Sequence, residues 1–428
     1  MTGSESVSES ESGETDTHRI CMVLPDPFPR DVRVEKEIRA LRETGHEVVV
    51  VCRGSGDGDG GEPTRERVDV ADGIPVVRVQ RDGPRARVAN VASAAVDTAV
   101  GVHPRWLLAV DRVVDDFDAS VLHVHDLPLL RTGLVVGHRR DLPVVADLHE
   151  NYPESVRQWR REGPGVRENP LTAAKRALLP VSRLKRRERR VVPEADRVVT
   201  VVEEAREHYC RDCGVPPLRT QVVGNTVDQE VFDPESVEPA SVDGLDDDRF
   251  TAAYVGGFGP HRGLETAIRA LAATGDSVEL LLVGDGPKMA DLRDLATDLG
   301  VASRVTFTGW VDLDDVPHYV AAADAGLVPH AATPHTETTI PHKLFQYMSM
   351  GRPVVVSALA PLERVVDGAD AGRVVPPGDA SALAGVLAEF AENRALATRF
   401  GRNGRAAVEE TYHWGRDAER LRDVYRDL

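Results

Sequence analysis

Short apolar runs alternate with amphipathic stretches along almost the whole chain. Runs such as RICMVL, EVVVVC and SVELLLV are strand-like, whereas VRVEKEIRALRETGH repeats its apolar residues at helical spacing. A strand, helix, strand, helix order predicts parallel sheets that are covered by helices on both faces. The sequence therefore predicts an α/β fold.

The alternation is interrupted once, by the acidic linker QEVFDPESVEPASVDGLDDD. The 428 residues also exceed what one hydrophobic core usually fills. We therefore expect two doubly wound parallel-sheet domains, at residues 19–230 and 231–410, that face each other across a cleft. The amphipathic stretch within 411–428 is expected to pack back on the first domain.

The first 18 residues, MTGSESVSESESGETDTH, are acidic and rich in serine. A signal peptide would instead be basic and then apolar, so we expect a disordered acidic tail on a cytoplasmic protein. We also find no uncharged apolar segment near the ~20 residues of a membrane span.

The net charge of −18 argues against nucleic acid as a partner, because a duplex would be repelled over most of the surface. The chain contains only five lysines, so nearly all of its cations are arginine. An acidic, lysine-poor surface is typical of halophilic proteins, whose carboxylates hold water at very high salt.

One region departs from this charge balance. Residues 157–190 contain twelve Arg or Lys against three Glu. We interpret this region as a positive, partly apolar surface for peripheral contact with anionic lipid at the inner face of the membrane. The alternative is a solvated helix face that pairs with the acidic body of the protein.

Cys210 and Cys213 form a C-x-x-C motif with His208 just upstream. Zinc sites of this kind need a second ligand pair, which the sequence does not supply, and the stretch resembles a helix that ends at Gly214. We therefore expect no metal here, and four cysteines in so long a chain do not predict a disulfide framework.

The stretch VGGFGPHRGLET, at residues 255–266, joins a strand to a helix. Its glycines do not have the G-x-G-x-x-G spacing of a dinucleotide site, so nicotinamide binding is not expected. The turn offers bare backbone, a helix N-terminus and Arg262, which together favour an anion such as a diphosphate.

These motifs carry a resemblance that runs from about residue 19 to the end of the chain. Its blocks include RDVRVEKEIRALRETGHEV, LHVHD, DLHENYPE, VVGNTVDQEVF, YVGGFGPHRGLETAIRAL, LLLVGDGP, VTFTGWV and HKLFQYMSMGRPVVVS. The chain resembles the retaining GT-B glycosyltransferases of the glycogen-synthase-like superfamily (family 4-like, group 1). The resemblance implies two Rossmann-like domains and a nucleotide-diphosphate sugar as donor.

The resemblance places the donor site in the second domain. Where the family has an Arg and a Lys beside the diphosphate, this chain has Gly257 and Arg262, and Lys343 could supply the second cation. Where the family has a pair of Glu, it has Thr338 and Gln346. The implied donor-binding residues are Gly256, Gly257, His261, Arg262, Gly284, Trp310, Thr338, Ile340, Lys343 and Gln346.

The first domain is implied to bind the acceptor. His149, in ADLHE, lies where the family has a cleft histidine, and with Arg262 and Lys343 it makes up the expected catalytic set. The expected acceptor-binding residues are Arg33, His125, Asp126 and Glu150. Each of these has a structural alternative, as a turn, capping or solvated residue.

The resemblance implies transfer of a sugar, with retention, to a hydroxyl or phosphate of a glycan or lipid-linked acceptor. No metal and no cofactor are expected, because protein cations would stabilise the departing diphosphate. Two alternatives stay open. One is a catalytically silent GT-B subunit that binds a nucleotide sugar or a partner, and the other is a GT-B nucleotide-sugar epimerase.

Overall fold

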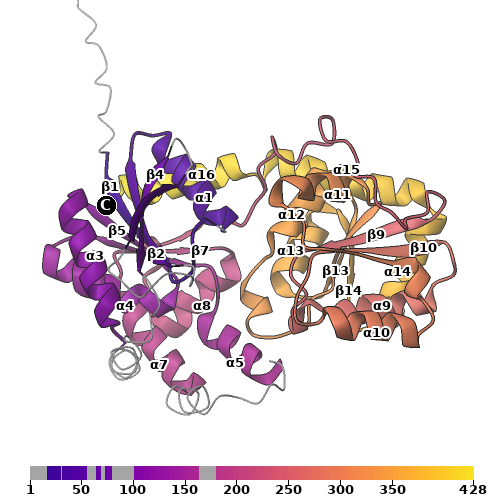
Figure 1. Cartoon of the computed structure of the whole chain (residues 1–428), viewed down its shortest axis with the longest axis horizontal. Helices are drawn as coiled ribbons and strands as arrows, with labels where there is room; N and C mark the ends of the chain where they lie inside the picture. The colour runs from indigo at the N-terminus through magenta and orange to yellow at the C-terminus, as the bar shows by residue number, and fades with distance from the viewer. Residues whose placement is uncertain (1–16, 30, 55–63, 69–72, 80–100, 163–179) are drawn as a thin grey trace, which may run out of the picture.

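The computed structural model contains two α/β domains, which lie side by side in Figure 1. It describes residues 17–29, 31–54, 64–68, 73–79, 101–162 and 180–428. Most of the predicted tail and the middle of the basic region lie outside these residues. Within the described ranges, every helix is too short or too polar to cross a bilayer.

The first domain is built on an eight-stranded sheet of order β3-β4-β2-β1-β5-β6-β7-β8. Its strands are β1 (Arg19–Val23), β2 (Glu47–Arg53), β3 (Thr64–Val68), β4 (Ile74–Val79), β5 (Val121–His125), β6 (Val144–Leu148), β7 (Arg197–Thr200) and β8 (Thr220–Val222). All neighbours are parallel except β3, which pairs antiparallel with β4 at the edge. Every residue of β5 and β6 is buried, as expected for strands covered on both faces.

The second domain has a six-stranded parallel sheet of order β11-β10-β9-β12-β13-β14. Its strands are β9 (Phe250–Val255), β10 (Val278–Val283), β11 (Val305–Gly309), β12 (Ala325–Val328), β13 (Val354–Ser357) and β14 (Gly372–Val375). In both sheets the strand order reverses beside the first strand, between β1 and β5 and between β9 and β12. Ligands of doubly wound sheets bind at such switch points.

Helices cover both sheets. The first domain has α1 (Val32–Arg42), α3 (Pro104–Phe117), α4 (Leu127–Arg140), α5 (Tyr152–Glu162), α7 (Val181–Val191) and α8 (Glu203–Cys213). The rest of the chain has α9 (Leu264–Ala273), α10 (Met289–Asp298), α11 (Val316–Ala321), α12 (His342–Ser349), α13 (Ala360–Ala369), α14 (Ala380–Glu392), α15 (Arg394–Glu410) and α16 (Trp414–Arg426). Short 3₁₀ turns are η2 (Val192–Glu194), η3 (Pro217–Arg219), η4 (Pro260–Arg262), η5 (Ala302–Arg304), η6 (Leu313–Asp315) and η7 (Thr336–Thr338).

The last helix returns to the first domain. α15 packs in the second domain, and α16 then lies along α1 (Figure 1). Leu421 and Tyr425 of α16 are buried in one apolar cluster with Ile38 and Leu41 of α1. The two domains are therefore connected by two chain crossings, the linker before β9 and the turn before α16.

The predicted fold class is confirmed, with two local differences. The edge hairpin β3–β4 is antiparallel, because a short connection cannot make the crossover that a parallel pair needs. The apolar stretch RTQVVGNTVD is strand-like in sequence, but the strand covers only Thr220–Val222. Beyond it, the carbonyl oxygens of Val223 and Thr226 accept hydrogen bonds from the side chains of Arg33 and Lys36.

Candidate active site

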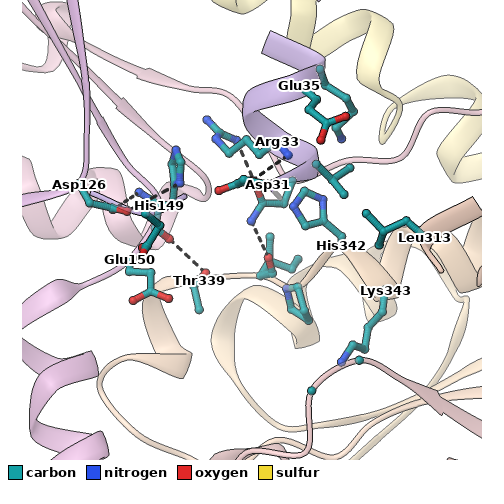
Figure 2. Close-up of a pocket in the computed structure, with 18 of the residues that line it drawn as sticks. Asp31, Arg33, Glu35, Asp126, His149, Glu150, Leu313, Thr339, His342 and Lys343 are labelled. Carbon is teal, nitrogen blue, oxygen red and sulfur yellow. Dashed lines mark hydrogen bonds and ion pairs between the residues drawn. The ribbon is translucent and has the colours of Figure 1, made fainter. Parts of the chain in front are cut away.

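A cleft of about 1460 Å³ lies between the two domains, at the carboxyl ends of both sheets. Its lining includes Gly256, Arg262 and Lys343 from the second domain and Asp126 and His149 from the first. Figure 2 shows His149 and Lys343 on opposite sides of this space. The cleft therefore joins the two switch points, where a donor and an acceptor could meet.

The glycine-rich turn after β9 forms one wall of the cleft. Gly256 has φ +129° and Gly284, after β10, has φ +131°, which L side chains rarely adopt. A Cβ on Gly284 would lie 2.2 Å from the carbonyl oxygen of Gly256, and one on Gly263 would lie 1.8 Å from that of Pro329. Glycine at these positions lets the turn pack against the ends of β10 and β12.

Two cations lie beside this turn. Arg262 ends η4, just before α9, and its Nη1 lies 3.4 Å from Nε2 of His330. Lys343 is in the first turn of α12, and its Nζ lies 3.7 Å from the centre of the Tyr254 ring. Within the described part of the chain, neither cation forms an ion pair with a carboxylate. Burial, reinforced by Arg262, holds the pKa of Lys343 well below its usual range.

Three histidines surround Arg262. The ring of His261 lies 6.3 Å from that of His330 and 6.0 Å from that of His335, between ring centres. Burial and the positive charge of Arg262 lower the pKa of His261 to about 3 and hold that of His330 well below its usual range. This wall of the cleft is therefore positively polarised, and burial favours the neutral form of its histidines.

The opposite wall contains His149, directly after β6. Its Nε2 lies 3.3 Å from Oδ1 of Asp147 and 3.1 Å from Nδ1 of His125, and its backbone N–H donates to Asp126. Burial disfavours the charged imidazolium, but Asp147 and Asp126 outweigh burial and raise the pKa of His149 to about 10. Burial in turn raises the pKa of Asp126 to about 7, against the opposing effect of His149. His149 is therefore a cation near neutral pH.

Beneath His149 lies a buried network of charges around Arg33. The Arg33 side chain is 2% exposed, and its Nε lies 2.8 Å from Oε1 of Glu37. Its Nη2 contacts both carboxylate oxygens of Asp147, and its Nη1 donates to the carbonyl oxygen of Val223. Glu37 and Asp147, with His123 and His125, are close enough together to hold a metal ion. A guanidinium already supplies the positive charge there.

Both halves of the chain match models of glycosyltransferase families. Residues 32–231 match the model described as Glycosyltransferase Family 4, and residues 249–393 match the model described as Glycosyl transferases group 1. The chain is a glycosyltransferase with the GT-B fold.

Whole-length relatives agree with this assignment. The transferase is 25% identical over 409 residues to D-inositol 3-phosphate glycosyltransferase 1 of Catenulispora acidiphila, a match that covers 92% of this chain and 90% of the relative. It also shares its fold with sucrose-phosphate synthase from Thermosynechococcus elongatus, with a TM-score of 0.70, 20% identity and coverage of 96% and 99% of the two chains. Anabaena HepE in complex with UDP-glucose superimposes with a TM-score of 0.69, 16% identity and coverage of 96% and 100%.

Most of the predicted donor residues lie on the cleft of the transferase. They are Gly256, Gly257, Arg262, Gly284, Trp310, Ile340, Lys343 and Gln346. His261 and Thr338 are not part of the lining. The Thr338 hydroxyl donates instead to the carbonyl oxygens of Pro334 and His335, and Glu337 accepts from the backbone N–H of Ala360. Of the two positions where the family has Glu, only Gln346 faces the cleft.

Of the predicted residues of the first domain, some line the cleft and one lies behind it. Asp126, Glu150 and His149 line the cleft, and Arg33 reaches its floor. His125 is 1% exposed and lies behind His149, so it can act only through that histidine. Acceptor binding by these residues stays a prediction.

Three further residues of the cleft were not predicted from the sequence. His330 and His335 follow the strand AGLV, and Thr339 donates to the carbonyl oxygen of His149 across the domain boundary. His330 directly follows β12, but only the fold shows that β12 lies beside β9 at the switch point. No local pattern identifies Glu37, whose importance comes from its contact with Arg33.

Proposed function

We propose that this glycosyltransferase moves a sugar from a nucleotide-diphosphate donor to a hydroxyl or phosphate of an acceptor, with retention of the anomeric configuration. The relative from Catenulispora acidiphila is named for D-inositol 3-phosphate, a phosphorylated polyol, and the HepE structure is described as a complex with UDP-glucose. The HepE complex supports a nucleotide-diphosphate donor, and the name of the relative supports an acceptor with hydroxyl and phosphate groups. They leave open the base and the sugar that this chain uses.

The observation that carries this proposal is the pair of cations, Arg262 and Lys343, without carboxylate partners beside a glycine-rich turn. Cleavage of the anomeric bond leaves negative charge on the diphosphate and positive charge on the sugar ring. The two cations and the N-terminus of α9 stabilise the growing negative charge, and they are in place before it forms. No metal is required for this role.

His149 acts on the acceptor side of the sugar. Because Asp147 and Asp126 keep it protonated near neutral pH, its ring donates hydrogen bonds to sugar oxygens and does not accept the acceptor's proton. The proton passes instead to an oxygen of the departing diphosphate. This assignment makes the leaving group the base, and it places the acceptor on the face that the diphosphate leaves.

A silent subunit is the second candidate, and one observation favours it. Thr338 and Gln346 replace the carboxylates that the resemblance places beside the sugar and ribose, and Thr338 is turned away from the cleft. A subunit of this kind would bind a nucleotide sugar and transfer nothing.

We also propose peripheral contact with anionic lipid through the basic region, which would suit an acceptor on a lipid phosphate. α5 and α7 pack together and carry its described parts, and Trp159 on α5 is 52% exposed. Glu154 pairs with Arg157 and Lys185, so the protein itself neutralises part of this charge. We expect the protein to sediment with anionic vesicles but not with neutral ones. Equal sedimentation with both would contradict the proposed contact with anionic lipid.

The proposed activity is tested by incubating the full chain with labelled UDP- and GDP-sugars, with and without a lipid extract. Thermal shift first identifies the donor that binds. Transferred label supports the transferase, and the proton coupling at the new anomeric centre reports retention or inversion. Binding without transfer from any donor supports the silent subunit, and an altered sugar on the free nucleotide supports the epimerase.

A further inference from the structure

Three potential metal ligands converge outside the cleft, between α7 and α8. They are Glu188 of α7 and His208 and Cys213 of α8, and their ligand atoms all lie within 4.8 Å of one another. Glu188 and Cys213 are buried, and the His208 side chain is 18% exposed. The three residue types include the thiolate and imidazole that zinc prefers.

Asp212 orients the histidine of this cluster. Its Oδ2 lies 3.0 Å from Nδ1 of His208, so Nδ1–H can donate to it and Nε2 then faces the other two ligands. A carboxylate on the far nitrogen of a ligating histidine is the usual outer shell of a zinc site, because it fixes the tautomer and increases ligand basicity.

The distance between the ligands also fits a shared metal. Nε2 of His208 lies 3.4 Å from Oε2 of Glu188, and this buried nitrogen has no hydrogen-bond partner within the described residues. A charge-assisted hydrogen bond would be about 2.7–2.9 Å. Two ligands about 2.0–2.1 Å from one tetrahedral zinc lie about 3.3 Å apart, which matches the observed separation.

We propose that Glu188, His208 and Cys213 bind a zinc ion that joins α7 to α8, with water as the fourth ligand. Binding releases the thiol proton of Cys213 to solvent, and the thiolate and carboxylate then balance the charge of the ion. No Arg or Lys forms an ion pair with Glu188 among the described residues, in contrast to the cluster around Arg33.

The site would stabilise a helix that supports the cleft. Tyr209 of α8 donates to the carbonyl oxygen of Glu150 on the cleft wall, and Glu204 of α8 forms an ion pair with Arg364 of the second domain. Zinc would fix one end of this helix against the basic helix α7.

The structure separates the two cysteines of the C-x-x-C motif. Only Cys213 belongs to the cluster, because Cys210 points toward Thr220, with Sγ 3.7 Å from its hydroxyl oxygen. The missing partner, Glu188, comes from the preceding helix. A glutamate ligand from another helix is not visible in the spacing of the motif.

The test uses the full chain, freed of metal by a chelator and titrated with Zn²⁺ against a chromophoric competitor. We expect 1:1 binding in the wild type and at least about 10-fold weaker binding in Cys213→Ser and His208→Gln, since even loss of an outer-shell partner costs about 10–100-fold. Cys210→Ser is the matched control and should bind as the wild type does. Co²⁺ should give a thiolate charge-transfer band that Cys213→Ser lacks.

Two outcomes would overturn the proposal. Equal affinity of the wild type and Cys213→Ser for Zn²⁺ would place any ion elsewhere. No binding by a folded wild type would mean that His208 is a protonated link between two carboxylates, and stability would then fall as the pH rises above about 6.5. Circular dichroism of each apo variant separates lost binding from lost folding.

Discussion

Arg33 and Lys36 in the first domain, and Arg262 and Lys343 in the second, are four cations around one cleft with opposite surroundings. Arg33 contacts two buried carboxylates, and Lys36 donates to the carbonyl oxygen of Thr226 at 2.6 Å. Arg262 and Lys343 contact a histidine and an aromatic ring. Lys343 is buried and Arg262 is half-buried, and a desolvated charge without an opposite charge is costly, so the retention of these cations points to an anion that binds there. The partnered cations stabilise the architecture of the first domain.

Arg33→Met is the strongest test of the difference between cations with and without carboxylate partners. The substitution leaves Glu37 and Asp147 buried without their cation, and we expect a loss of about 3–5 kcal/mol in the free energy of unfolding. Urea denaturation measures it. Arg39→Met, on the exposed side of the same helix, is the control and should change stability by less than about 0.5 kcal/mol. A mild effect of Arg33→Met would show that the network is not structural.

Arg262→Ala should act on turnover and not on folding. We expect kcat/KM for the donor to fall about 10²–10³-fold, because a preorganised donor to the leaving group is lost. Binding of the free nucleoside, measured by calorimetry, should be unchanged, since nucleoside has no phosphate. Equal losses in both measurements would contradict the proposed role.

Lys343→Met separates the two kinds of cation most directly. We expect about a 10²-fold loss in kcat/KM, together with an unchanged or raised melting temperature, because an unpaired buried ammonium is replaced by an apolar chain. Lys288→Met, which removes a surface lysine paired with Glu265 and Asp291, is the control and should leave turnover unaltered. A large drop in the melting temperature of Lys343→Met would instead show that this lysine, like Arg33, mainly stabilises the fold.

Gly284→Ala tests the backbone of the turn. Its Cβ would meet the Gly256 carbonyl at 2.2 Å with φ +131°, and we expect about 1–3 kcal/mol of destabilisation from strain, together with weaker donor binding. At Gly257 the nearest atom to an added Cβ is 4.0 Å away, so Gly257→Ala should fold as the wild type does. Thermal melts with and without nucleotide compare the two. Similar stability of both variants would refute the close approach.

A last comparison concerns the pH dependence of the stability that His149 provides. Its pKa is about 10 in the folded protein and about 6.5 when unfolded, so its stabilisation is complete below pH 6.5 and is lost as the pH rises toward 10. We expect the stability difference between wild type and His149→Gln to shrink between pH 7 and 10. Unfolding in urea at three pH values measures it, and a constant difference would mean that Asp147 does not hold the imidazolium.

The candidate site was only partly predictable. Gly256 and Arg262 were found because a strand that ends in glycines before a helix is a local pattern with a chemical meaning, whereas Lys343 was suggested only by the family resemblance. Thr338 was misplaced relative to the cleft, since η7 turns its hydroxyl toward the backbone of Pro334 and His335. His330 and His335 became visible only when β12 was seen next to β9.

The sequence by itself determined the alternation of strands and helices, the division into two domains and the glycosyltransferase resemblance, because these depend on periods and motifs a few residues long. Only the tertiary structure decided which charges are satisfied. Arg33 meets Asp147 across 114 residues of chain and Val223 across 190. The packing of strands against one another determines which distant side chains meet. The same packing leaves Arg262 and Lys343 without a carboxylate partner beside the cleft.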